Sequence, residues 1–262
     1  MKTIKLHNQT VCFDSYNFES KTELKSFLES KKIKTILENM KQEVIMVLGW
    51  DGTILRAIRK HYKQEKAFLP INFWTKWFLL NDKNYISKSS EFISREYPLI
   101  NCKVKTKNKI FKNIAFNEVV IKETDCKMID LDISVNEKQF LNLQWDWLLI
   151  STPAGSTGYN SSLYWPILPH TSQSFILTPK AAWIPKRQSS VIFENKNNIK
   201  VSNQNRLNPI WIYADGQEIY KTNGEMINIE IKKSKYKIEL LIAKNYEGIW
   251  DNKVLQEQWF DN

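Results

Sequence analysis

The stretch VIMVLGWDGTIL, residues 44 to 55, decides the fold class of this chain. Its first five residues, Val44 to Leu48, are all apolar, which predicts a strand buried on both faces of a parallel sheet. A glycine-containing turn around Asp51 follows, and Thr53 begins a helical pattern. α/β proteins use such a strand–turn–helix to bring backbone N–H groups close to an anion. The stretch therefore predicts a phosphate-binding turn, with an unexpected residue, Trp50, inside it.

The segments around this turn alternate between strand and helix patterns. Short extended segments are predicted over 2–7 and 10–13, and a mostly helical pattern covers 21–40. After the turn, a helix is predicted from about 53 to 63 and a strand over 67–72. This β–α–β order predicts a parallel, Rossmann-like sheet with the turn at the carboxyl end of a strand.

From about residue 101 the pattern changes to short β-rich segments separated by Asn, Asp, Gly and Lys turns, which predicts an antiparallel β domain. The predicted strands are 104–109, 110–121, 128–135, 138–143, 148–151, 174–177, 190–193, 199–201, 209–214, 226–231 and 237–242. We therefore expect an α/β plus all-β fold. A Rossmann-like domain covers residues 1–100, a β-sandwich domain covers 101–244, and a tail, 245–262, packs back on the first domain.

The composition limits the classes of function. The chain has 262 residues, of which 42% are hydrophobic, enough for one large or two modest cores. No apolar run approaches the roughly 18–20 residues of a membrane span, and the first residues lack the apolar region of a signal peptide. The three cysteines, Cys12, Cys102 and Cys126, form no CxxC pair, so we expect free thiols in a reducing cytoplasm. The three histidines have no metal-ligand spacing, so no zinc site is expected.

The formal net charge of +10 raises the question of nucleic-acid binding. The lysines are spread along the whole chain, and there is no basic arm and no RNA-binding signature. We expect no nucleic-acid partner. Two interpretations of the charge stay open: an ordinary lysine-rich surface, or a basic cleft for polyanionic small molecules such as nucleotides.

Two further segments contain polar groups suited to a nucleotide. The pair Asn117-Glu118 interrupts an apolar strand, and an ionised buried glutamate there would need partners such as ribose hydroxyls. From the pair alone, a polar turn between two strands is the favoured interpretation. The segment Ser151-Thr152-Pro153-Ala154-Gly155-Ser156-Thr157-Gly158-Tyr159-Asn160 runs from a strand into a hydroxyl-rich turn and a predicted helix start. Such a turn can bind an anion or a ribose, or it can simply cap the helix.

In this order, Gly49-x-Asp51-Gly52-Thr53, Asn117-Glu118 and Ser151-Thr152-Pro153-Ala154-Gly155-Ser156-Thr157-x-Tyr159-Asn160 resemble the signature set of NAD kinases. The later Tyr213-Ala214-Asp215-Gly216-Gln217 fits the same family. The resemblance extends from about residue 44 to 220. Lipid kinases share the GGDGT turn but lack the other two motifs at these distances.

The resemblance implies an activity, its cofactor and its partners. The chain would phosphorylate NAD to NADP with ATP or polyphosphate, and a divalent metal, Mg²⁺, would be carried with the phosphate donor. The active site would lie in the cleft between the two domains. The family is usually oligomeric, so a homo-oligomer, a dimer or a tetramer, is expected. No membrane partner is expected.

The resemblance also implies the site residues. Asp51 would accept the proton of the 2′-hydroxyl of the adenosine ribose. The phosphate turn would consist of Gly49, Gly52, Thr53 and Arg56. The NAD-binding positions would be Asn72, Phe78, Asn117, Glu118, Asp146, Thr157, Gly158, Tyr159, Asn160, Ser161, Ser162, Ala181 and Gln217.

One departure from the family pattern is systematic. The chain has 7 glycines and 10 tryptophans, whereas about 18 glycines would be average for this length. Six tryptophans lie where the family has glycine: Trp50, Trp74, Trp77, Trp145, Trp147 and Trp165. Glycine and tryptophan codons differ by one base, and some bacteria read UGA as glycine. Two interpretations follow: UGA codons read as glycine in the source organism, or genuine indoles in a weak or inactive relative. A genuine Trp50 is expected to be strained at a positive φ.

Overall fold

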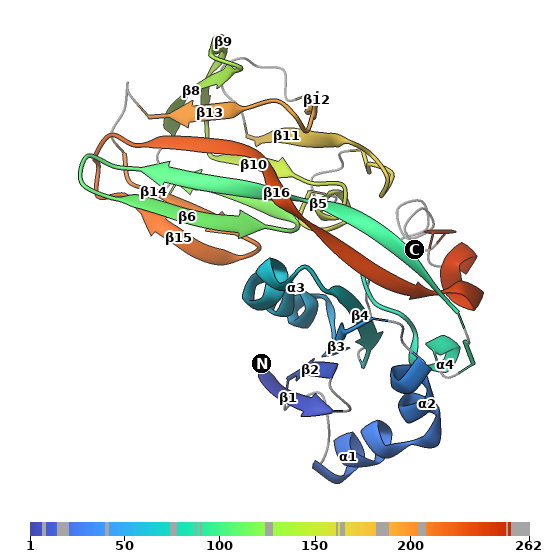
Figure 1. The fold of residues 1–262 in the computed structure, drawn as a ribbon. Coiled ribbons are helices and arrows are strands. Elements are labelled where there is room, and N and C mark those ends of the chain that lie inside the picture. Colours follow the sequence, from blue (N-terminus) through green and yellow to red (C-terminus); the bar gives the residue numbers. More distant parts are fainter. Residues whose placement is uncertain are drawn as a thin grey trace. The chain divides into compact units, whose positions relative to one another are not determined.

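The computed structural model describes residues 1–6, 9–14, 21–39, 42–73, 78–86, 88–89, 91–123, 128–160, 162, 166–181, 189–203, 208–249 and 251–252. The chain divides into two compact units. The first consists of residues 1–97 together with 236–262, and the second of residues 98–235. Strands β5 and β16 each begin in one unit and end in the other (Figure 1).

The first unit contains the expected parallel sheet. Its strands are β1 (Lys2–Leu6), β2 (Gln9–Phe13), β3 (Val44–Gly49), β4 (Ala67–Asn72) and the end of β16 (Asn228–Ala243), adjacent in that order. β1 and β2 form an antiparallel hairpin, whereas the neighbours from β2 to β16 are parallel. Every residue of β3 and β4 is buried, which for β3 is the burial that its apolar run from Val44 to Leu48 predicts.

The helices of the first unit are α1 (Lys21–Glu29), α2 (Lys31–Asn39), α3 (Asp51–His61), the 3₁₀ turn η2 (Tyr62–Gln64), α4 (Lys83–Ile86) and the 3₁₀ turn η5 (Lys244–Tyr246), which leads into a short helical turn at 247–249. The single helical segment predicted over 21–40 is divided at Ser30, whose hydroxyl accepts a hydrogen bond of 3.4 Å from the N–H of Ile33. Helix α3 begins at Asp51, two residues before the predicted start. It buries Ile54, Ala57 and Ile58. None of the helices in the described ranges is long and apolar enough to cross a membrane.

The second unit contains antiparallel strands in two sheets. The first sheet comprises β5 (Phe92–Lys105), β6 (Ile110–Ala115), β8 (Ile129–Val135), β9 (Lys138–Trp145), β13 (Ile199–Ser202) and the first half of β16. The other is six-stranded, in the order β12 (Val191–Glu194), β11 (Ser174–Lys180), β10 (Trp147–Ser151), β7 (Glu118–Glu123), β14 (Ile210–Ala214) and β15 (Gln217–Lys221). Buried aliphatic side chains from both sheets form one core. The predicted α/β plus all-β fold class is confirmed.

Several predicted strand boundaries are wrong. The strand predicted over 110–121 is two strands, β6 and β7, with Phe116 and Asn117 between them. The strands predicted over 226–231 and 237–242 are both parts of β16, because its lysine-rich middle stays extended at the surface. Residues 92–103 and 217–221 are strands that were not predicted.

Candidate functional site

The Asp51 turn lies in the first unit, at the carboxyl end of β3. Gly49 ends the strand, Trp50 caps helix α3, and Asp51 is the first helical residue. The Asp51 carboxylate accepts hydrogen bonds of 3.0 Å from the backbone N–H groups of Phe78 and Leu79. Two backbone donors from a distant segment therefore fix the orientation of this carboxylate.

Asn81 anchors the segment that carries these two donors. Its side chain is fully buried and donates hydrogen bonds of 2.8 Å to the carbonyl oxygens of Pro70 and Leu241. Its Oδ1 accepts a bond of 2.7 Å from the N–H of Ala243. Its backbone carbonyl accepts from the N–H of Asn72, at the end of β4. Asn81 thereby connects the segment that donates to Asp51 with β4 and β16. No motif in the sequence marks Asn81 for this role.

Trp50 does not have the backbone conformation that was expected. Its φ is −133° and its ψ is −179°, an extended conformation available to any residue, so the predicted strain is wrong. The indole lies over Gly52, where an added Cβ would come within 2.7 Å of the ring. The side chain is one-third exposed. A tryptophan is therefore accommodated at the turn, but it covers the glycine that would approach a phosphate.

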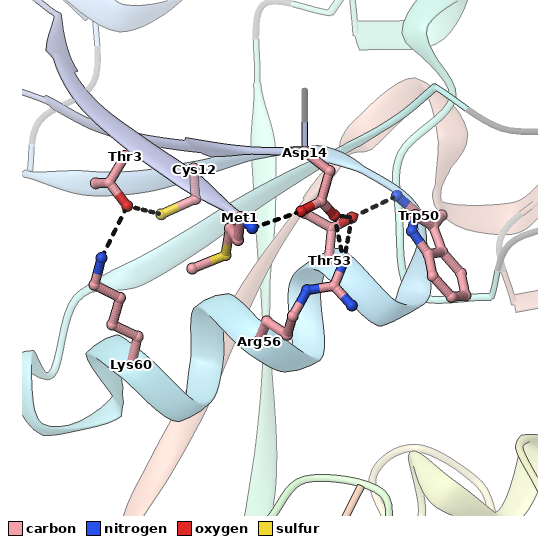
Figure 2. A network of polar contacts seen from close by, with 8 residues as sticks. All are labelled: Met1, Thr3, Cys12, Asp14, Trp50, Thr53, Arg56 and Lys60. Carbon is pink, nitrogen blue, oxygen red and sulfur yellow. Dashed lines mark hydrogen bonds and ion pairs between the residues drawn. The ribbon is translucent and has the colours of Figure 1, made fainter. Parts of the chain in front are cut away.

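Arg56, the expected charge partner of the phosphates, is bound to a carboxylate within the first unit (Figure 2). Its Nη2 donates to Oδ2 of Asp14, and the Thr53 hydroxyl donates to the same oxygen at 2.5 Å. The guanidinium carbon lies 5.8 Å from the centroid of the Trp50 ring. Asp14 was not among the expected site residues.

A second group of expected residues lies in the second unit, where β6 turns into β7. Asn117 is in the turn and Glu118 is the first residue of β7. The Asp215 carboxylate accepts backbone hydrogen bonds from Phe116 at 2.9 Å, Asn117 at 2.8 Å and Glu118 at 3.2 Å. Asp215 itself lies in the β14–β15 turn at a φ of +46°. It therefore positions the Asn–Glu pair, although the resemblance assigned it no role.

Two oxygen atoms of this pair are buried without a hydrogen-bond partner in the described part of the chain, Oδ1 of Asn117 and Oε2 of Glu118. Burial, and then the nearby charge of Asp215, raise the pKa of Glu118 to about 8. Buried polar groups are normally paired, so such atoms call for an explanation. A hydroxyl-rich ligand such as a ribose would supply the missing partners.

The segment from Ser151 to Asn160 packs directly on this turn. The hydroxyl of Thr152 donates to the carbonyl oxygen of Phe116 at 2.5 Å, and its N–H donates to the carbonyl oxygen of Asn117 at 2.9 Å. A Cβ added at Gly155 would overlap the Asn117 carbonyl, whereas at Gly158 it would lie 3.6 Å from Glu118 Oε2. Gly155 is thus required for the packing of the segment on the Asn–Glu turn.

The helix predicted to start in this segment is not found in its described part. Residues Gly155–Thr157 form only a three-residue 3₁₀ turn, η3. The hydroxyls of Ser156 and Thr157 donate to the carbonyl oxygens of Pro153 and Ala154 at 2.6 and 2.9 Å. These hydroxyls stabilise the turn itself, because they satisfy carbonyls that a longer helix would have paired.

The remaining expected positions are dispersed within the second unit. Asn160 is buried and accepts a hydrogen bond of 2.7 Å from the Thr178 hydroxyl. Ser162 donates to the carbonyl oxygen of Tyr159 at 2.7 Å, and burial followed by the Glu118 charge raises the pKa of Tyr159. The other positions are Asp146 between β9 and β10, Ala181 after β11 at a φ of +56°, and Gln217 at the start of β15. Ser161 lies outside the described residues.

A row of alternating lysines and tryptophans crosses the six-stranded sheet, and we call it the Lys–Trp ladder. In register order it is Lys180, Trp147, Lys122, Trp211 and Lys221, one residue from each of five neighbouring strands. The ammonium groups lie 4.4 to 5.2 Å from the ring centroids, distances typical of cation–π pairs. Trp147 is therefore partnered on both sides. Trp74, Trp77, Trp165 and the side chain of Trp145 lie outside the description.

No group of three or more His, Cys, Asp or Glu side chains in the described ranges is arranged to hold a metal ion. The two cysteines in these ranges, Cys12 and Cys102, are buried free thiols.

Known proteins resemble this chain along nearly its whole length. Residues 116–242 match the family described as the ATP-NAD kinase C-terminal domain. An NAD kinase of Rickettsia prowazekii is 31% identical over 250 residues, covering 93% of this chain and 96% of the relative. An NAD kinase of Rickettsia bellii is also 31% identical, over 251 residues, with the same coverage.

Two solved structures share the fold. The crystal structure of an NAD kinase from Archaeoglobus fulgidus in complex with ATP has a TM-score of 0.71 at 21% identity, covering 94% of this chain and 97% of that one. Yeast NADH kinase in complex with NADH has a TM-score of 0.69 at 19% identity, covering 82% and 66%. The fold and the sequence relatives together define a phosphotransferase. The chain belongs to the NAD kinase family.

Proposed function

We propose that this chain phosphorylates the 2′-hydroxyl of the adenosine ribose of NAD and thereby forms NADP. The observation that supports this most directly is the Asn117–Glu118 pair, whose oxygens Asn117 Oδ1 and Glu118 Oε2 are buried without a hydrogen-bond partner in the described part of the chain. Ribose hydroxyls are donors of the right size and polarity for these acceptors. Asn117 and Glu118 would therefore hold a ribose.

In this proposal Asp51 acts as the general base. Phosphoryl transfer requires mainly positioning and charge neutralisation from the protein, with one base for the attacking hydroxyl. The Asp51 carboxylate is suited to this role because the N–H groups of Phe78 and Leu79 hold it in one orientation. Asn72 and Phe78 would line the same part of the site.

The phosphate donor, ATP or polyphosphate, would bind at the turn formed by Gly49, Gly52 and Thr53, at the amino end of α3. The partial positive charge of a helix amino end and the Arg56 guanidinium both favour phosphate there. A divalent metal, Mg²⁺, would be bound chiefly by the oxygen atoms of the donor and would neutralise their charge. The +10 net charge of the chain is in keeping with two polyanionic substrates.

The other residues proposed to contact NAD come from the second unit. The Tyr159 ring would stack on a base, since aromatic faces pack well against purines. The remaining contacts would come from Asp146, Thr157, Gly158, Asn160, Ser161, Ser162, Ala181 and Gln217.

One observation favours a second function, binding of NAD(P) without turnover. The Trp50 indole lies over Gly52, so it occupies space next to the proposed phosphate turn. If this ring blocks the phosphate donor, the chain would bind NAD(P) without phosphorylating NAD and would act as a sensor.

The two functions are separated by an assay of NADP formation with NAD, ATP and Mg²⁺, run beside calorimetric titration of NAD. Kinase activity that is abolished by Asp51→Asn supports the first function. NAD binding without NADP formation, restored to turnover by Trp50→Gly, would identify the tryptophan as the cause. NAD binding without NADP formation in both the parent chain and Trp50→Gly would favour the sensor.

We also propose that the chain works in the cytoplasm as a homo-oligomer, a dimer or a tetramer. The buried free thiols Cys12 and Cys102 are in keeping with a reducing compartment. Light scattering of the purified chain measures the assembly, and a monomer at micromolar concentration would contradict it.

A further inference from the structure

Asp14 is a buried carboxylate next to the Asp51 turn that neither the motifs nor the resemblance assigns to a function. It directly follows β2, which is parallel to β3 and pairs Phe13 with Leu48. Asp14 therefore comes level with Gly49, the residue at which β3 enters the turn. Its side chain is only 2% exposed.

Three donors converge on the Asp14 carboxylate (Figure 2). The Thr53 hydroxyl and Arg56 Nη2 both donate to Oδ2, and the amino group of Met1 lies 3.0 Å from Oδ1. Burial raises the pKa of Asp14, but the hydrogen bonds from Thr53, from the terminal amino group and from Arg56 outweigh it and leave the pKa below its ordinary value. Asp14 therefore stays ionised at neutral pH and remains ion-paired with Arg56.

The guanidinium of Arg56 is held from two sides. Asp14 binds Nη2, and the Trp50 ring lies 5.8 Å from the guanidinium carbon, within the range of a cation–π contact. One-third of the Arg56 side chain remains exposed, so part of it can still meet a ligand. An arginine held in this way loses little side-chain freedom when it binds an anion, which lowers the entropic cost of binding.

We propose that Asp14 is a positioning residue for the phosphate donor. It orients the Arg56 guanidinium and the Thr53 hydroxyl, which both belong to the first two turns of α3. Asp14 does not touch the donor itself, because its carboxylate is buried and its negative charge would repel a phosphate. This inference rests on the proposed assignment of the turn to the donor, and it adds a residue that the assignment did not contain.

The first test is Asp14→Asn, which keeps the shape of the side chain and removes its charge. Affinity for the Mg²⁺ complex of a non-hydrolysable ATP analogue is measured by calorimetry. We expect donor affinity to fall about tenfold, the loss that corresponds to one charge-assisted hydrogen bond, while the affinity for NAD stays within twofold. An equal loss for NAD and donor would indicate a general structural role and overturn the proposal.

A double-mutant comparison shows whether Asp14 acts through Arg56. Arg56→Gln alone is expected to weaken donor binding at least tenfold. In that background, Asp14→Asn should add less than a twofold effect, whereas an independent role would add its full tenfold. Because Arg56 is partly exposed, Arg56→Gln remains informative even if Asp14→Asn does not fold. Unchanged donor affinity in Arg56→Gln overturns the proposal by itself.

Glu43→Gln is the matched control. Glu43 also forms an ion pair in the first unit, with Lys66, but at the start of β3, the end opposite the Asp51 turn. This variant should leave donor affinity unchanged. NADP formation that survives Asp51→Asn would contradict the proposed function. It would not bear on the Asp14–Arg56 coupling, because that coupling is measured from donor binding alone.

Discussion

The Asp215 carboxylate accepts a hydrogen bond of 2.8 Å from the backbone N–H of Asn117, a residue 98 positions earlier in the chain. The same carboxylate also accepts from Phe116 and Glu118. Replacing Asp215 with alanine leaves three backbone donors without their acceptor and places alanine at a positive φ. We expect a loss of about 2–4 kcal/mol in the free energy of unfolding, measured by urea denaturation, and a raised KM for NAD.

Two further variants control this prediction. Asp215→Asn keeps one acceptor oxygen and tolerates the left-handed backbone conformation, so its loss should be about half as large. Asp132→Asn changes a partly exposed carboxylate that pairs with Asn142 in the same unit, and should stay within about 0.5 kcal/mol of the parent. If Asp215→Ala is as stable as Asp132→Asn, Asp215 does not hold the Asn–Glu turn.

The raised pKa of Glu118 predicts that the free energy of unfolding depends on pH. Its pKa is about 8 in the folded chain, above the ordinary value of 4.5, so the folded state binds the proton more tightly than the unfolded state. The stability gained from this is complete below about pH 4.5 and is lost as the pH rises through about 8. Urea midpoints of the parent should therefore fall from pH 5 to pH 9 by more than those of Glu118→Gln. Equal slopes for the two chains would contradict the raised pKa.

The same residue predicts proton release on NAD binding. Hydroxyl donors to the Glu118 carboxylate stabilise its charged form and lower its pKa. Calorimetric titration of NAD at pH 7.5, in buffers of different ionisation enthalpy, should show protons leaving the protein. Glu118→Gln should remove this dependence on buffer, and a dependence that persists would place the titrating group elsewhere.

Replacing glycine with alanine is expected to have opposite effects on stability at Gly155 and Gly248. A Cβ at Gly155 would overlap the backbone of Asn117, so Gly155→Ala should cost several kcal/mol and abolish NAD binding. Gly248 lies in a helical turn with nothing within 4 Å of an added Cβ. Gly248→Ala should therefore be neutral or stabilising by up to about 1 kcal/mol, because alanine restricts the unfolded chain. Thermal unfolding of both variants measures the difference.

Replacing tryptophan with glycine is expected to cost more stability at Trp147 than at Trp50. Trp147→Gly removes a ring between Lys122 and Lys180 and leaves a glycine within a strand, which should cost about 1–3 kcal/mol. Trp50→Gly removes a one-third exposed ring and should cost less than about 1 kcal/mol. A stable Trp147→Gly chain would favour glycine as the residue made in the source organism, and mass spectrometry of the protein purified from that organism reads the residue directly.

Local patterns were sufficient for the central part of the fold. The buried strand β3, the turn after it and helix α3 follow from an apolar run, a glycine-containing break and a helical period, all within residues 44–61. The Asn–Glu pair and the Ser151–Asn160 segment were likewise recognisable from their order in the sequence. Strand β15 and the first part of β5 were missed because mixed polar segments carry a weak periodic signal.

The sequence by itself determined the fold class, the family and the Asp51 turn, because each of these follows from short local patterns and from their order along the chain. Only the tertiary structure decided which distant groups hold them: the Asp14 carboxylate on Arg56, the N–H groups of Phe78 and Leu79 on Asp51, and the Asp215 carboxylate on Asn117. It also decided that Lys180, Trp147, Lys122, Trp211 and Lys221 form one ladder. A period of two residues tells which face of a sheet a side chain occupies, whereas strand order and register decide its neighbours.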